Sequence, residues 1–253
     1  MKKSGLSRYV GSILIFAGLF FVYALITDIG KLLNPLIFPG LGKIFRALIS
    51  SRKLLFIGFL SSMRLLFPAL LLAIVLGVSI GAVVGLNEKL KRLFMPIFSA
   101  LNPIPPTMLI PYAIAIFPTF WLSSASIIMI GVFWPVLRST IHGIIFLEPR
   151  WIDNARCLNL KGAKLVFKII LPGIMPQIFA GIESGLIMSF ILLTVGEIFG
   201  ARAGLGYFVQ YYADFAEYDR VLAGMFVLSL VVLLITLGFN RLKTRVLYWT
   251  KKR

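Results

Sequence analysis

Long runs of uncharged, apolar residues decide what this chain can fold into. The longest extends from Leu93 to Leu137 without a single Asp, Glu, Lys or Arg. Because one helical crossing of a bilayer needs about 20 apolar residues, this run is long enough to cross twice. The chain is 59% hydrophobic with a mean hydropathy of +0.96, which leaves too little polar surface for a water-soluble globule. We therefore predict an all-α membrane protein.

Four other apolar runs each have the length of one crossing. They are Tyr9–Thr27, Leu65–Asn87, about Gln177–Gly200, and Val221–Asn240. Within the longest run, the stretch from Pro118 to Ser124 has the proline and serines that are typical of a turn. The sequence thus predicts about six transmembrane helices in a single membrane domain over residues 1–253.

The basic residues predict the orientation of these helices. The net charge is +17, yet the cations fall in short clusters between apolar runs, which argues against a nucleic-acid partner. Most of them would lie inside if the N-terminus is inside, so the positive-inside rule places both termini in the cytoplasm. The connection 28–64 argues the other way, because it carries several cations on the predicted outer side.

Glycines recur every four residues in the second predicted span, at Gly77, Gly81 and Gly85. This spacing places all three on one helical face, where another helix can approach to backbone contact. We expect tight helix packing at this face, and a sliding interface of a transporter is the alternative.

A proline-rich segment opens the third span, with Asn102, Pro103, Pro105 and Pro106. Prolines remove backbone hydrogen bonds, and irregular backbone at membrane depth is tolerated where it faces protein or a water-filled path. The segment therefore indicates either part of a translocation pathway or a simple kink near the inner surface.

Glu183 and Glu197 are carboxylates inside an apolar span, and such groups are functional candidates by default. Their spacing corresponds to about 21 Å along a helix, too far apart to share a metal or a proton. For Glu183 we expect an ion pair with Arg138 or a hydrogen bond to His142. A role in ion-coupled transport by a stand-alone secondary carrier is the alternative. With one Cys and one His, no metal centre is expected.

The inner loop at about 147–176 is the longest predicted cytoplasmic segment. We expect Asp153 in the first turn of one short helix, an interruption at Gly162, and a second short helix that ends at Pro172. The second helix has an apolar stripe, which favours contact with lipid headgroups or with a partner protein. The sequence has no GxxxxGK[ST] phosphate loop, so another subunit would have to bind any nucleotide that powers transport.

Several motifs, in order along the chain, resemble the permease subunits of bacterial binding-protein-dependent ABC importers of the nitrate, sulfonate and taurine type. The family's cytoplasmic Glu-Ala-Ala loop is matched by Asp153-Asn154-Ala155, Gly162 and Leu171-Pro172, with Asp and Asn as departures. The other matching segments are Asn102–Pro111, Phe133–Leu137, Gly196-Glu197 and Gly204–Tyr207.

The resemblance implies a type I ABC importer permease fold in the bacterial inner membrane. It implies a second permease copy in a homodimer, two cytoplasmic ATPases, an extracytoplasmic solute-binding protein, and no cofactor or enzyme site in this chain. The transported substrate would be a small organic or inorganic solute such as a sulfonate, taurine, nitrate, or a vitamin or pyrimidine precursor. The implied ATPase-coupling residues are Asp153, Asn154, Ala155, Leu158, Gly162 and Pro172. The candidate pathway residues, from the proline-rich segment and the apolar span described above, are Asn102, Pro103, Pro105, Pro106, Glu183 and Glu197.

Overall fold

The computed structural model describes residues 5–30, 33–101 and 103–251, and every regular element in these ranges is a helix. The N-terminal half contains α1 (Gly5–Ala24), the π-helix η1 (Leu25–Ile29), α2 (Leu41–Ser50), α3 (Arg52–Leu86), α4 (Glu88–Leu101), the 3₁₀-helix η2 (Pro106–Leu109) and α5 (Ile110–Ile116). The C-terminal half contains α6 (Phe120–Ile145), α7 (Pro149–Cys157), α8 (Gly162–Leu165), the π-helix η3 (Val166–Ile170), α9 (Leu171–Ile198), α10 (Leu205–Asp214), α11 (Tyr218–Val246) and η4 (Tyr248–Lys251).

Among the described residues, four helical segments are long and apolar enough to cross a membrane. They are α3, α6, the continuous segment Gly162–Ile198, and α11. A bent pair, α4 with the segment Pro106–Ile116, has the composition of a fifth crossing, and Ala17–Ile29 is a shorter apolar helix. The prediction of an all-α membrane protein is confirmed.

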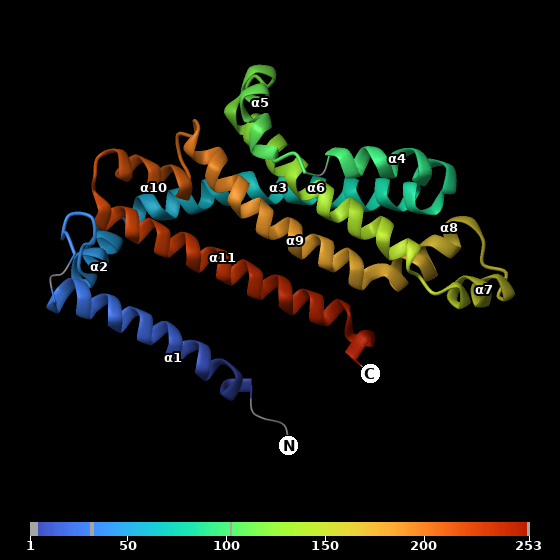
Figure 1. Cartoon of the computed structure of the whole chain (residues 1–253), viewed down its shortest axis with the longest axis horizontal. Coiled ribbons are helices and arrows are strands. Elements are labelled where there is room, and N and C mark those ends of the chain that lie inside the picture. Colours follow the sequence, from blue (N-terminus) through green and yellow to red (C-terminus); the bar gives the residue numbers. More distant parts are fainter. Residues whose placement is uncertain (1–4, 31–32, 102, 252–253) are drawn as a thin grey trace.

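Helix α6 lies at the centre of the bundle, packed against α3 on one side and α9 on the other (Figure 1). Gly77 and Gly81 of α3 are what allow the close approach to α6. A Cβ on Gly77 would lie 2.9 Å from Val136 Cγ1, and one on Gly81 would lie 2.8 Å from Thr140 Cβ. Gly85 meets Ile144 in the same way, while Gly181 and Gly185 of α9 meet the opposite side of α6.

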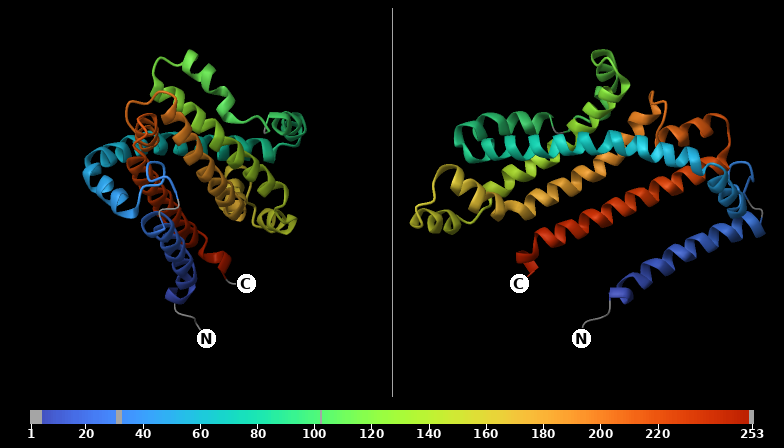
Figure 2. Two further views of the ribbon diagram at one scale, coloured as in Figure 1. Left: turned by 60° about the vertical axis from the view of Figure 1, so that its left-hand side comes forward. Right: turned by 180° about the vertical axis from the view of Figure 1, so that it is seen from behind.

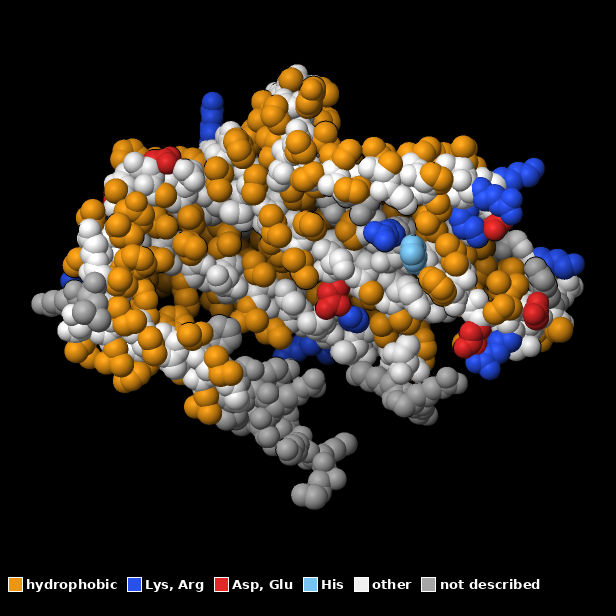
Figure 3. Space-filling view, viewed as in Figure 1, with side chains coloured by type: hydrophobic (Ala, Val, Ile, Leu, Met, Phe, Trp, Pro, Cys, Tyr) orange, Lys and Arg blue, Asp and Glu red, His pale blue; other side chains and the backbone are white. Residues whose placement is uncertain are grey.

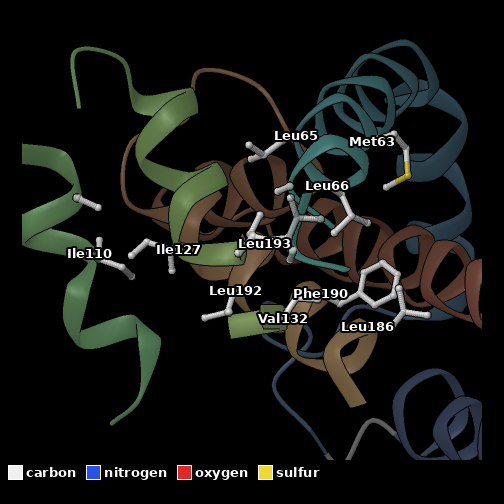
Figure 4. Close-up of a cluster of buried hydrophobic side chains, with 14 of the residues drawn as sticks. Met63, Leu65, Leu66, Ile110, Ile127, Val132, Leu186, Phe190, Leu192 and Leu193 are labelled. Atoms are coloured by element: carbon white, nitrogen blue, oxygen red, sulfur yellow. The ribbon is translucent and has the colours of Figure 1, made fainter. Parts of the chain in front are cut away.

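The main core lies where α3, α6 and α9 meet, with a contribution from α5 (Figure 4). The labelled side chains, including Leu66, Val132 and Leu193, converge between these helices, and Ile110 reaches them from α5. By contrast, α1 and α11 lie along one side of the bundle (Figure 2). The start of α1 and the end of α11 lie near one another, as predicted for termini on the same side of the membrane.

Two predicted boundaries need correction. Helix α3 begins at Arg52 rather than Leu65, because the exposed Arg64 is carried within the helix and does not end it. The turn within the long apolar run is confined to residues 117–119, so Ser123 and Ser124 lie inside α6. Ser123 Oγ donates to the Ala113 carbonyl at 3.0 Å, which accounts for a serine that is tolerated inside a buried helix.

The inner loop also differs from the prediction. Asp153 lies in the middle of α7, because that helix already begins at Pro149. The second helix does not end at Pro172 but runs without a break from Gly162 to Ile198. The π-helix η3 lies just before this proline, with Leu171 N–H bonded to the Val166 carbonyl, and its wider turn accommodates a residue that has no N–H.

Candidate transport and coupling sites

The segment Pro149–Ile170, here called the coupling arm, projects from one end of the bundle (Figure 1). It comprises α7, the turn after it, α8 and η3, and α7 packs against η3. Ala155 is only 1% exposed, whereas Trp151 and Leu158 are 51% and 73% exposed. Asp153 and Asn154 are also exposed. Within the arm, α7 therefore packs against η3, while Trp151 and Leu158 present apolar side chains outward.

Two residues with positive φ shape the turn within the arm. Asn159 has φ +54° just after α7, and Leu160 N–H donates to the Ala155 carbonyl at 2.9 Å. This hydrogen bond and the left-handed residue form a Schellman ending, which an asparagine can adopt at little strain. Gly162 has φ +54° and opens α8. The chain can thus reverse direction and enter the long membrane helix.

Glu197 lies at the opposite end of α9 from the arm, in a cluster of buried hydrogen bonds. Its side chain is 1% exposed, and it accepts from Ser62 Oγ and from Gly206 N–H, both at 2.6 Å. Ser62 Oγ in turn accepts from Leu205 N–H at 3.0 Å. These bonds join α3, α9 and the start of α10. The structure thus places Glu197 in an enclosed polar cluster, away from open surface.

Two glycines make room for this carboxylate. A Cβ on Gly204, whose φ is +151°, would lie 2.3 Å from the Glu197 carboxyl carbon. A Cβ on Gly206 would lie 2.9 Å from the Thr194 carbonyl oxygen. Ser61 Oγ adds a hydrogen bond to the Ala203 carbonyl at 3.1 Å. Gly204 and Gly206 therefore allow the loop before α10 to close directly over the carboxylate.

Glu183 is half-exposed and forms an ion pair with Lys243 of α11, with 2.5 Å between Oε2 and Nζ. The prediction of a structural ion pair is correct in kind, but the predicted partners, Arg138 and His142, are wrong. Helix α11 packs against α9 on the side away from α6, and so it supplies the cation. Glu183 and Glu197 are not brought together.

The proline-rich segment breaks the helical path between α4 and α5. Pro103 and Pro105 are exposed in irregular backbone, and Pro106 opens η2. Pro106 also lines an apolar cavity of about 460 Å³ between α3, α4 and α6. The predicted pathway residue Asn102 lies outside the described residues. The break therefore borders a cavity within the membrane-spanning part of the protein.

Sequence reasoning missed Ser62 and Lys243. Ser62 is 135 positions from Glu197 along the chain, and Lys243 is 60 positions from Glu183. No local spacing could reveal these pairs, because each one depends on which helices cross.

Comparison with known proteins identifies the family. Residues 73–248 match the model of the binding-protein-dependent transport system inner membrane component. The taurine transport system permease protein TauC of Escherichia coli (strain K12) is 30% identical over 189 residues, which cover 75% of this chain and 69% of that protein. The formylaminopyrimidine transport permease protein ThiX of Halalkalibacterium halodurans is 25% identical over 210 residues, covering 83% of this chain and 84% of that protein.

The fold is also similar to a solved ABC transporter. A chain of the MetNI methionine ABC transporter, in an inward-facing conformation, aligns with a TM-score of 0.66 at 20% identity. The alignment covers 78% of this chain and 98% of that one, so the fold is that of type I ABC importer permeases. The apolar helices, the family match and this shared fold agree: the chain belongs to the binding-protein-dependent transport system inner membrane components and is a multi-pass permease subunit of an ABC importer.

Proposed function

We propose that two copies of this chain form the translocation pathway and that the coupling arm of each copy binds a separate cytoplasmic ATPase. An extracytoplasmic binding protein delivers a small solute to the outer end of the pair. The chain itself binds no ATP, because its sequence contains no phosphate loop. ATP hydrolysis by the partner subunits moves the arm, and the arm moves the membrane helices.

The exposure of the coupling arm is the observation that carries this proposal. Large apolar side chains stand exposed at Trp151 and Leu158, on and just after the polar, charged helix α7, which lies outside the apolar spans. Exposed apolar side chains rimmed by polar residues are typical of a protein-binding surface. Ala155 is buried within the arm, whereas Trp151 and Leu158 are exposed, which supports Trp151 and Leu158 as the residues that contact the ATPase.

Support for a second copy comes from α5. This short helix extends away from the α3–α6–α9 bundle (Figure 1), and Met108, Tyr112 and Ile116 around it are each more than 60% exposed. The irregular backbone before it needs cover by protein or water within a bilayer. A second permease copy would supply that cover and would place the two proline breaks at a shared pathway.

The ion pair of Glu183 opposes a stand-alone carrier. An ion-coupling carboxylate must exchange its cation during transport, whereas Glu183 is already neutralised by Lys243. We therefore favour a structural role for Glu183 between α9 and α11.

The coupling arm is tested by site-specific cross-linking in intact cells. In a Cys157→Ser background, Leu158→Cys is treated with a short bifunctional maleimide. The control is Ile29→Cys, which is equally exposed, at 74% against 73%, but lies at the end of η1, between α1 and α2, whereas the arm lies at the other end of the molecule (Figure 1). We expect Leu158→Cys, and not Ile29→Cys, to cross-link to the ATPase subunit.

A second variant tests force transmission. Gly162→Pro forces φ to about −65° at a position that needs +54°, so the arm should point elsewhere. Membrane insertion should persist while binding-protein-stimulated ATP hydrolysis is lost. Absence of the Leu158 cross-link, or normal stimulation in the Gly162→Pro importer, would overturn the proposed role of the arm.

A further inference from the structure

Arg138 is a cation within a membrane-spanning helix for which the described residues provide no carboxylate partner. It is exposed on α6, level with Gly81 of α3, because the Cβ position of Gly81 faces Leu137 and Thr140. Gly81 lies about 8 Å along the axis from the end of α3 at Leu86. The Glu183 carboxylate, which the sequence indicates as a candidate partner of Arg138, forms an ion pair with Lys243 instead.

Arg138 borders a cavity between α4 and α6. Arg138 lines it together with Met95, Phe98, Ser99, Trp134, Leu137 and Ile141. The cavity has a volume of about 120 Å³. An engineered protein cavity of about 150 Å³ holds a benzene molecule, so this one has room for a small solute group. Its lining contains a cation and a serine hydroxyl but no acidic residue.

A second cavity shares one wall with the first. Trp134 lines both, and the second cavity has a volume of about 460 Å³ and an apolar lining that includes Leu76, Pro106 and Phe133. Passing from the proline break toward the inner end of α6, a solute would thus meet apolar side chains first and Arg138 next. Figure 3 shows hydrophobic side chains over most of the visible face, with Lys and Arg side chains gathered mainly at the end that carries α7 and α8 in Figure 1.

We propose that Arg138 binds the negatively charged end of a small organic anion carried by this importer, with the apolar part of that anion against Trp134. The inference rests on the proposed function and narrows its substrate to organic anions. A guanidinium matches an oxyanion through two parallel hydrogen bonds, and these charge-assisted bonds are strong in a partly dehydrated site. Ser99 provides a further hydroxyl donor at the same cavity.

Trp134 provides a direct reporter of the site. In the full-length chain, purified in maltoside micelles that contain no phosphate, Trp121, Trp151 and Trp249 are replaced by Phe so that Trp134 fluorescence is measured alone. Iodide serves as an anionic quencher and acrylamide as a neutral one. Arg138→Gln removes the cation, and Arg52→Gln removes an exposed cation at the other end of the molecule as a matched control.

We expect Arg138→Gln to lower the iodide quenching constant about threefold, because the cation raises the local anion concentration. Acrylamide quenching should stay unchanged, and Arg52→Gln should match the parent with both quenchers. Butanesulfonate should protect Trp134 from iodide at lower concentrations than methanesulfonate, and only when Arg138 is present. Equal iodide quenching with and without Arg138, or equal protection by neutral butanol, would overturn the proposal.

A lipid phosphate is the other source of an anion at this depth. The measurement is therefore repeated in nanodiscs of phosphatidylglycerol. If the Arg138-dependent quenching and the butanesulfonate protection persist there, the site serves a water-borne anion. If both disappear in the nanodiscs, lipid headgroups hold Arg138 and the proposal is overturned. Because this assay contains no ATPase, its failure leaves the Leu158 cross-link unaffected, and the two proposals fail independently.

Discussion

The two ends of the long segment Gly162–Ile198 differ in how they are stabilised. At the outer end, Glu197 and Ser62 form a buried cluster with backbone amides of the loop before α10. At the inner end, the coupling arm packs only lightly and exposes Trp151 and Leu158. The outer end is therefore enclosed within one chain, whereas the inner end leaves apolar side chains uncovered, where the proposed function places the ATPase. Substitutions should separate these two cases by their effect on the stability of the isolated chain.

The largest loss is expected for Glu197→Ala. The change leaves Ser62 O–H and Gly206 N–H buried without an acceptor, which we expect to lower the free energy of unfolding by about 4 kcal/mol. Denaturation of the purified chain in micelles measures this loss. The control is Glu217→Ala, an exposed carboxylate paired with Arg220, which should change stability by less than about 1 kcal/mol. Similar losses in both variants would show that the outer cluster is not a special source of stability.

Gly204→Ala should have the next largest effect and lower the free energy of unfolding by about 3 kcal/mol. Its φ of +151° disfavours a side chain, and the new Cβ would collide with Glu197. Gly42→Ala in α2 is the control, since a Cβ there meets nothing within 4 Å. The two cluster substitutions should also be non-additive. In a Glu197→Ala background, Gly204→Ala loses its collision partner, and an unchanged effect there would contradict the described contact.

Between α3 and α6, toward the inner end of α3, Gly81→Ala should lower the free energy of unfolding by about 2 kcal/mol, because its Cβ would lie 2.8 Å from Thr140 Cβ and 3.0 Å from the Leu137 carbonyl. Gly238→Ala in α11 has open space around the new methyl group and should not destabilise the chain. Thermal unfolding of both variants measures the difference. If Gly81→Ala were as stable as Gly238→Ala, the tight α3–α6 contact would be ruled out.

The ion pair of Glu183 and Lys243 should contribute less to the free energy of unfolding than the buried contacts above, because both side chains are about one-third exposed. A double-mutant cycle with Glu183→Gln and Lys243→Met should give a coupling free energy of about 1 kcal/mol or less. Transport by an importer with Glu183→Gln should persist. Loss of transport with unchanged stability would favour the carrier interpretation of this carboxylate instead.

The smallest change in stability is expected for Trp151→Ala in the coupling arm. Because the side chain is half-exposed and lies outside the bundle core, the free energy of unfolding should change by no more than about 0.5 kcal/mol. In the assembled importer the same variant should reduce binding-protein-stimulated ATP hydrolysis about tenfold, since it removes an apolar contact with the ATPase. A large stability loss without a coupling defect would mean that the arm is a structural element of this chain alone.

Local patterns predicted the parts of the molecule that depend on local physics. The uncharged runs indicated the spans because a bilayer tolerates few charges, and the four-residue spacing of Gly77, Gly81 and Gly85 indicated a packing face that the structure shows against α6. The boundaries were less accurate, since Arg64 and Pro172 both lie within continuous helices. A single cation or proline is tolerated where exposure or a π-turn accommodates it.

The polar contacts could not be predicted in the same way. The partner of Glu183 depends on α11 lying beside α9, and the partner of Glu197 depends on α3 passing beneath α10. These contacts join residues far apart in sequence, so spacing along one helix carries no information about them. A carboxylate inside an apolar run indicates that a partner exists, but only the crossing of helices decides which residue it is.

The continuity of the helix from Gly162 to Ile198 has a mechanical consequence. Its 37 residues correspond to about 55 Å along the axis, with the exposed arm at one end and Glu197 close to the other. The π-helix η3 and Pro176 are the points of this helix at which it bends most readily. Under the proposed function, a displacement of the arm would reach the Glu197 cluster through one continuous helix, reduced by any bending at these two points.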